Sequence, residues 1–119
     1  MQYLLLIYGT ESHWAKQDPS DRDKMLEEFS QFTQSIAKSG HLRGGNELDT
    51  TSKATTVRLR DGKRLVTDGP FAETKEQLGG YYLVEAKDLD EAIGLAARIP
   101  SVRTGSIEVR PIIPHDMPS

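Results

Sequence analysis

Two segments of the chain are apolar on both faces of an extended backbone. Apolar side chains occupy successive positions in Gln2–Tyr8, and the pattern repeats in Gly80–Ala86. A strand with one face in water alternates apolar and polar residues, so both segments predict central strands of a sheet. Ser106–Arg110 does alternate, and it predicts the last strand.

A long amphipathic helix is predicted over residues 19–39. Asp18 followed by Pro19 is typical of an N-cap and a first helical position. One stripe of the helix carries Met25, Phe29, Phe32 and Ile36. The segment before this helix, residues 11–17, is predicted to be a loop that holds His13 and Trp14.

A second helix follows the strand at residues 80–86. Asp88 and Glu91 form a pair of the capping-box type, and Pro100 ends the helix. Gly94 lies inside this helix, where glycine costs roughly 1 kcal/mol relative to alanine. We therefore expect close packing against a neighbour at Gly94.

A β-hairpin is predicted near the middle of the chain. Asp61-Gly62 separates the extended runs Ala54–Arg60 and Lys63–Thr67, which is a strong signal for a two-residue turn. The alternation in the first run predicts a hairpin with one solvated face. Before it, Gly44-Gly45 interrupts an extended segment and predicts a bulge or a close approach of another backbone.

The order strand–helix–strand, hairpin, strand–helix–strand predicts an α+β fold, a ferredoxin-like sandwich with both helices on one sheet face. Residues 1–111 form its single domain and residues 112–119 a tail. One layer of helices cannot cover strands that are apolar on both faces. We therefore predict a two-fold homodimer that packs the uncovered sheets face to face, as a dimeric α/β barrel.

Composition narrows the functional classes. The chain has no cysteine, which excludes disulfides and thiolate chemistry, and its formal charge is −3 with acidic and basic residues interleaved. That argues against direct nucleic-acid binding, which needs a basic stripe. No apolar run is long enough to span a membrane or to act as a signal sequence, so we expect the cytoplasm. The three histidines are scattered, so no metal site and no cofactor are predicted.

The segment Asp68–Tyr82 is the strongest candidate for a functional loop. Asp68-Gly69-Pro70 predicts a turn between two extended runs, and Phe71 is expected to anchor that turn to the core. Gly79-Gly80 then leads into the aromatic strand. Loops held between rigid elements are where function concentrates.

These residues resemble a known family. Asp68-Gly69-Pro70-Phe71-Ala72-Glu73-Thr74-Lys75-Glu76 is similar to the signature of the DGPF group of YCII-related proteins. Residues 1–8, 44–48 and 107–111 carry the resemblance along almost the whole chain. It implies a dimeric ferredoxin-like fold and a largely unassigned activity. Some members are encoded beside alternative sigma factors of the extracytoplasmic-function type, which implies a regulatory context.

Wider YCII-related proteins resemble an enzyme through a His–Asp pair whose histidine lies on the first helix. This chain has no histidine between Pro19 and Ser39, so only Asp68 is offered as a loop carboxylate in that role. Asp68 acts as a general acid or base if the turn buries it and raises its pKa. The alternative, which we favour, is an Asx turn. His41 is a candidate proton shuttle, or a residue that complements the helix dipole.

Ligand-binding candidates surround the same turn. Lys75 can hold a carboxylate or phosphate, or belong to a solvated charged turn. Tyr8 and Tyr81 lie on the central strands, where core or interface packing is the alternative. The full set of candidate ligand-binding residues is Tyr8, Gly69, Pro70, Phe71, Lys75 and Tyr81.

Three functional hypotheses remain open. The first is a pocket beside the motif that binds a small polar or aromatic molecule, with cofactor-free acid–base chemistry at Asp68 assisted by His41 or Lys75 if the protein is an enzyme. The second, nearly as strong, is a non-catalytic regulatory or protein-interaction module linked to sigma-factor-dependent transcription. The third and weakest, from architecture alone, is a cofactor-independent monooxygenase or isomerase.

Overall fold

The computed structural model describes residues 1–116 of the 119. Its helices and strands follow the predicted order, with one short helix added. In chain order they are β1 (Gln2–Gly9), α1 (Glu11–Ala15), α2 (Pro19–Lys38), β2 (Leu42–Glu47), β3 (Thr55–Arg60), β4 (Lys63–Asp68), β5 (Gln77–Glu85), α3 (Leu89–Ala96) and β6 (Ser106–Pro111), with 3-10 turns η1 (Thr51–Lys53) and η2 (Pro100–Arg103).

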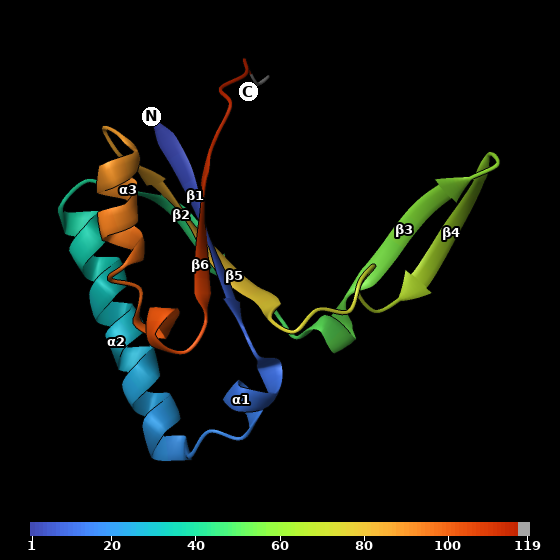
Figure 1. Ribbon diagram of the computed structural model, residues 1–119, viewed down its shortest axis with the longest axis horizontal. Coiled ribbons are helices and arrows are strands. Elements are labelled where there is room, and N and C mark those ends of the chain that lie inside the picture. Colours follow the sequence, from blue (N-terminus) through green and yellow to red (C-terminus); the bar gives the residue numbers. More distant parts are fainter. Residues whose placement is uncertain (117–119) are drawn as a thin grey trace.

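The main sheet is antiparallel, with the strand order β2-β5-β1-β6. Both long helices, α2 and α3, lie on one side of it (Figure 1). The α+β prediction is therefore confirmed, and this strand order agrees with the two interleaved βαβ units of the ferredoxin-like prediction.

The core fills the space between the sheet and the helices. Tyr3, Leu5 and Ile7 alternate along β1 toward the helices, where Phe32 and Ile36 of α2 meet them. The predicted N-cap of α2 is present, because the Asp18 carboxylate accepts a hydrogen bond from the Ser20 amide at 3.3 Å. Burying this stripe of α2 is what attaches the helix to the sheet.

The other side chains of the central strands point away from the helices. Leu4, Leu6 and Tyr8 share this face with Tyr81 and Leu83, since directly paired residues of antiparallel strands lie on the same side. No helix of residues 1–116 covers them (Figure 1). We call this surface the open face.

The hairpin forms as predicted but does not join the main sheet. β3 and β4 make a separate two-stranded sheet, and Asp61 and Gly62 both have positive φ angles, 52° and 74°, as a type I′ turn requires. We call residues 55–68 the arm, and it projects from the body (Figure 1). The radius of gyration is accordingly 16.5 Å, against about 13.5 Å for a compact chain of this length.

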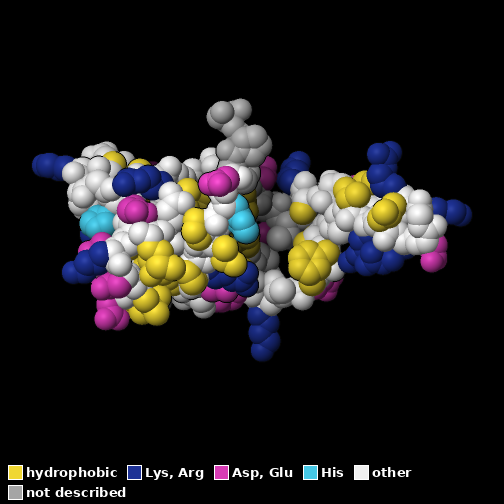
Figure 2. Space-filling model, turned by 90° about the horizontal axis from the view of Figure 1, so that it is seen from above, with side chains coloured by type: hydrophobic (Ala, Val, Ile, Leu, Met, Phe, Trp, Pro, Cys, Tyr) yellow, Lys and Arg dark blue, Asp and Glu magenta, His cyan; other side chains and the backbone are white. Residues whose placement is uncertain are grey.

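The prediction that only one face of the hairpin is solvated is wrong for the single chain. The apolar face of the arm is exposed, with Val57 63%, Leu59 66% and Val66 56% accessible. The face that carries Thr56 and Arg58 is the less exposed one. Figure 2 shows hydrophobic and basic side chains together on the surface of the arm.

Of three local predictions, one is confirmed and two are wrong. Residues 11–17 contain the short helix α1 rather than a loop throughout, because the amides of His13 and Trp14 both donate to the Thr10 carbonyl. Gly44-Gly45 does coincide with a register shift and with close approach to the β5 backbone. The expectation of close packing at Gly94 is wrong, since a Cβ atom there would meet nothing within 4 Å.

β6 ends at Pro111, the residue before the predicted tail of residues 112–119. Residues 117–119 of that tail lie outside the described residues. Within residues 1–116, no helix combines the length and the apolar character needed to cross a membrane.

Candidate functional site

The loop that follows β4 starts against the base of the arm. Gly69 has a φ angle of 94°, its amide donates to the Ala54 carbonyl at 2.7 Å, and its carbonyl accepts from Thr56 Oγ1 at 2.8 Å. We call residues 69–76 the motif loop. Phe71 is 78% exposed, so the expectation that it anchors the turn to the core of its own chain is wrong.

Asp68 lies at the end of β4 with an exposed side chain. Within residues 1–116, no group donates a hydrogen bond to the Asp68 carboxylate. The Asx turn that we favoured is therefore not formed. The burial on which acid–base chemistry depends is also missing from the single chain. Any burial of Asp68 must come from a second molecule.

The far end of the motif loop is fixed to the main sheet. Glu76 Oε1 accepts a hydrogen bond from Ser106 Oγ at 2.8 Å, and Gln77 Oε1 accepts from the Glu11 amide at 3.0 Å. Ser106 is the β6 partner of Tyr8. The structure therefore brings the end of the motif loop next to Tyr8, and Lys75 lies exposed on this stretch.

Polar side chains gather on the open face around its apolar centre. The Tyr81 hydroxyl accepts a hydrogen bond from Asn46 Nδ2 at 2.9 Å. On the other side of the face, Arg110 Nε donates to Glu108 Oε2 at 2.7 Å. The hydrogen bond and charge of Glu108 raise the pKa of the Arg110 guanidinium, and Tyr8 adds to that effect.

The open face thus combines an apolar floor with phenol, amide, carboxylate and guanidinium groups. Sequence reasoning found Tyr8 and Tyr81 but missed Asn46 and Glu108. The strand alternation in residues 106–110 put Glu108 and Arg110 on one face. The sequence alone did not show that β6 pairs with β1, which is what brings these two residues to the open face.

His41 lies at the opposite end of the sheet from the motif loop. Its carbonyl accepts from the amide of Glu85, the last residue of β5, whereas the motif loop leads into Gln77, the first. The eight residue-to-residue steps of β5 separate these ends by roughly 26 Å. The structure therefore does not bring His41 and Asp68 of one chain together.

The His41 side chain instead lies between the end of α2 and the start of α3. Ser39 Oγ lies 2.6 Å from His41 Nδ1, and His41 Nε2 lies 3.2 Å from Glu91 Oε1. Glu91 also accepts from the Lys87 amide, and the Glu91 amide donates to Asp88, so the predicted capping pair is confirmed. This arrangement ties the end of α2 to the start of α3.

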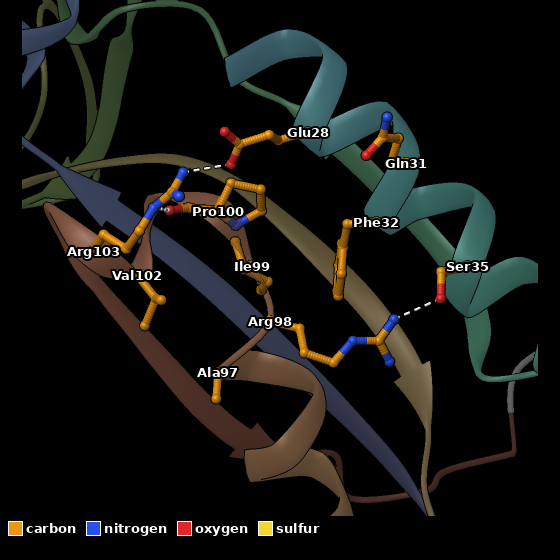
Figure 3. Close-up of a pocket in the computed structure, with 10 residues that line it drawn as sticks. All are labelled: Glu28, Gln31, Phe32, Ser35, Ala97, Arg98, Ile99, Pro100, Val102 and Arg103. Atoms are coloured by element: carbon orange, nitrogen blue, oxygen red, sulfur yellow. Dashed lines mark hydrogen bonds and ion pairs between the residues drawn. The ribbon is translucent and has the colours of Figure 1, made fainter. Parts of the chain in front are cut away.

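Cavities occur on other parts of the molecule. One of about 480 Å³ lies on the helical side, between α2 and the segment Ala97–Arg103 (Figure 3). A second, of about 280 Å³, lies beside the first residues of β1. Neither is lined by the motif loop. Within residues 1–116, no three histidine, aspartate or glutamate side chains come together as a metal site would require.

The family model of the YCII-related domain matches residues 1–116. The chain belongs to the YCII-related family. It is also similar to an uncharacterized protein of Rhizobium meliloti (strain 1021), with 36% identity over 124 aligned residues that cover the whole of both chains. The family resemblance stated from the residues is thereby confirmed.

Proposed function

We propose that this YCII-related protein is a cytoplasmic homodimer of the DGPF group that binds a small molecule between its open face and the motif loop. The observation that carries the proposal is the open face itself. An uncovered sheet surface with an apolar centre and a few convergent polar groups has the composition of ligand sites in proteins.

A second copy is the best cover for this face. Leu4, Leu6 and Leu83 form its centre, and the arm adds Val57 and Leu59 as a further uncovered apolar surface. Uncovered apolar surface of this kind often marks a site of protein–protein contact. Two open faces packed by a two-fold axis make the dimeric α/β barrel, with each arm reaching past the edge of its own sheet.

Charge supports contact between the arm and a second body. Residues 55–68 carry four basic and two acidic side chains, a net charge of +2, which leaves −5 for the rest of the chain. Opposite charge on the two surfaces steers the arm of one copy toward the body of the other. The same contact would shield Phe71, which its own chain leaves exposed.

The proposed ligand is a small polar or aromatic molecule. Tyr8 and Tyr81 offer aromatic faces and hydroxyls, and Arg110 offers a cation already held by Glu108. Gly69, Pro70, Phe71 and Lys75 would border the site from the motif loop.

If the protein is an enzyme, Asp68 is its titrating group in cofactor-free acid–base chemistry. The role requires that the partner subunit bury the carboxylate, which the single chain leaves exposed. Lys75, on the same loop, is the assisting group in this proposal. His41 takes no part within one chain, because the length of β5 lies between it and the loop.

Two measurements test the proposal. Light scattering at micromolar concentration should give about twice the 13.3 kDa mass of the chain. A thermal-shift screen with metabolites should then find a stabilising ligand whose effect falls in Asp68→Asn and Lys75→Ala. A 13.3 kDa species alone would refute the dimer. A ligand effect untouched by either substitution would refute the motif-loop site.

The exposed apolar surface of the arm favours a second candidate function. Such a surface also suits a non-catalytic regulatory or protein-interaction module, here one linked to sigma-factor-dependent transcription. A pull-down from the native host with wild-type chain and with Leu59→Lys separates the two candidates. A protein captured by the wild-type arm only would favour the module, and no such protein would favour the small-molecule site.

A further inference from the structure

The strand register of the arm places Asp68 on its exposed apolar face. Directly paired residues of antiparallel strands lie on the same side, and alternate pairs share that side. We call this side the Asp68 face of the arm, and its three pairs are Thr55 with Asp68, Val57 with Val66, and Leu59 with Arg64. Any surface that covers the apolar pair in the middle therefore also reaches Asp68.

The opposite face of the arm contacts the chain's own motif loop. Thr56 Oγ1 donates to the Gly69 carbonyl at 2.8 Å, and Arg58 Nη2 donates to the Phe71 carbonyl at 3.3 Å. Both donors alternate with Val57 along β3, so they lie on the other side of the arm. The Asp68 face has no such cover from the motif loop, and its apolar side chains are each more than half exposed.

Both connections between the arm and the body are anchored at Glu11. Before β3, Glu11 Oε1 accepts a hydrogen bond from the Thr51 amide at 2.8 Å, and Glu11 Oε2 accepts from Thr51 Oγ1 at 3.0 Å. After β4, the Gln77 side chain accepts from the Glu11 amide and donates to the Thr74 carbonyl at 2.6 Å. The arm therefore starts from two fixed points, which suits a contact of defined geometry.

The arm lies on the side of the main sheet that the helices leave uncovered. Figure 1 shows α2 and α3 on one side of the sheet and the arm on the other. A second copy packed on the open face therefore lies beside the arm. A two-stranded hairpin alone is marginally stable in water, so the arm is stabilised by such a neighbour. The net charges of arm and body, +2 and −5, favour contact with the body of that copy rather than with its arm.

We propose that the Asp68 face of the arm packs on the partner subunit, and that each ligand site combines Asp68 of one chain with the open face of the other. Asp68 ends β4 at the base of the arm, next to the plane where the two open faces meet. Arg64 lies four residues away along β4, roughly 13 Å farther out. The base therefore borders the site, and the apolar pairs beyond it supply the contact surface. This inference rests on the homodimer of the proposed function.

Thiol labelling tests the contact, because the wild-type chain has no cysteine and each variant carries a single one. Val66→Cys and Asp68→Cys place a thiol on the Asp68 face. In the dimer both should react with a maleimide at least about tenfold more slowly than in a Leu6→Lys background, where the subunits separate, because the thiol is reached only when the contact opens. Leu65→Cys is the matched control on the opposite face of the same strand, where Leu65 is 45% exposed. Its rate should be the same in both backgrounds.

A photo-cross-link identifies the surface that covers this face. A diazirine amino acid of leucine size is encoded in place of Val66, and dimers are formed from equal amounts of isotope-labelled and unlabelled chains. Irradiation should join labelled to unlabelled peptides, and the peptide captured from the other chain should belong to the main sheet rather than to α2 or α3. The same amino acid in place of Leu65 should give little product between chains.

The results that would overturn the inference can be told apart from a failure of the proposed function. Unprotected Val66→Cys in a chain of twice 13.3 kDa refutes the inference and leaves the homodimer standing. Equal protection of Leu65→Cys and Val66→Cys refutes a contact through one face. Cross-links confined to one chain, or made to α2 or α3 of the other, refute a site shared between subunits. A 13.3 kDa mass refutes the homodimer and the inference together.

Discussion

The indole ring of Trp14 occupies the space that a side chain at Gly79 would need. A Cβ atom on Gly79 would lie 2.5 Å from Cη2 of the ring, and one on Gly9 would lie 2.7 Å from Cζ2. Trp14 therefore packs directly on the backbone at the ends of β1 and β5. The indole thus covers the end of the core.

Gly79→Ala should destabilise the fold by about 1–3 kcal/mol, because the new methyl group forces the indole off the sheet. Urea unfolding of the variant measures the change. In a Trp14→Ala background the same substitution should cost much less, since the clashing ring is gone. An equal cost in both backgrounds would show that the indole is not the reason for a glycine here.

Gly94→Ala should instead increase the stability of the fold. Gly94 lies in the exposed part of α3, and a Cβ atom there meets no described atom within 4 Å. Alanine removes the helix penalty of glycine, so the free energy of unfolding should rise by up to about 1 kcal/mol. A loss of stability would indicate that a neighbour, such as a second subunit, approaches Gly94 closely.

Elements governed by local rules could be predicted from the sequence. The N-cap at Asp18, the Asp61-Gly62 turn and the capping pair of α3 each depend on residues a few positions apart. The central strands β1 and β5 were found because a short continuous apolar run between turn residues is typical of a buried strand. Gly94 misled the prediction, since a glycine in a helix does not by itself reveal a close neighbour.

Contacts between residues that lie far apart in the sequence could not be predicted from the sequence. The Asn46–Tyr81 hydrogen bond spans 35 positions and the Ser106–Glu76 bond spans 30. Alternation in the hairpin identified its apolar face, but not that this face would be left uncovered. For the same reason the candidate residues Asp68 and His41 were grouped, although strand β5 separates them.

Gly69→Ala should destabilise the chain by about 1–2 kcal/mol, the cost of a left-handed backbone for a residue with a Cβ. The φ angle of 94° creates this strain even though the space around Gly69 is open. Pro70→Ala is the matched change at the next residue. It places no side chain at a positive φ angle, so it should cost less. Thermal unfolding of both variants gives the comparison, and equal costs would argue against backbone strain at Gly69.

Glu91→Ala should cost about 1 kcal/mol, because Lys87 loses the acceptor for its amide and His41 loses its partner. Asp90→Ala is the neighbouring control on the first turn of α3 and should have a smaller effect. A double-mutant cycle with His41→Ala isolates the contact between the two side chains. A coupling near zero would mean that Glu91 acts only as a helix cap.

Leu6→Lys should convert the proposed dimer into monomers without unfolding the chain. Leu6 lies at the centre of the open face, between Tyr81 and Glu108 on the neighbouring strands, so two lysines would meet across a two-fold interface. Burying a further ammonium group there is strongly unfavourable, because the neighbouring Glu108 carboxylate is already paired with Arg110, whereas in a separate subunit the ammonium group reaches water. Leu26→Lys is the matched control, because Leu26 is 55% exposed on α2, on the helical side. Light scattering should report a halved mass for Leu6→Lys and an unchanged mass for Leu26→Lys. The reverse pattern would place the subunit interface on the helices and leave the open face to another partner.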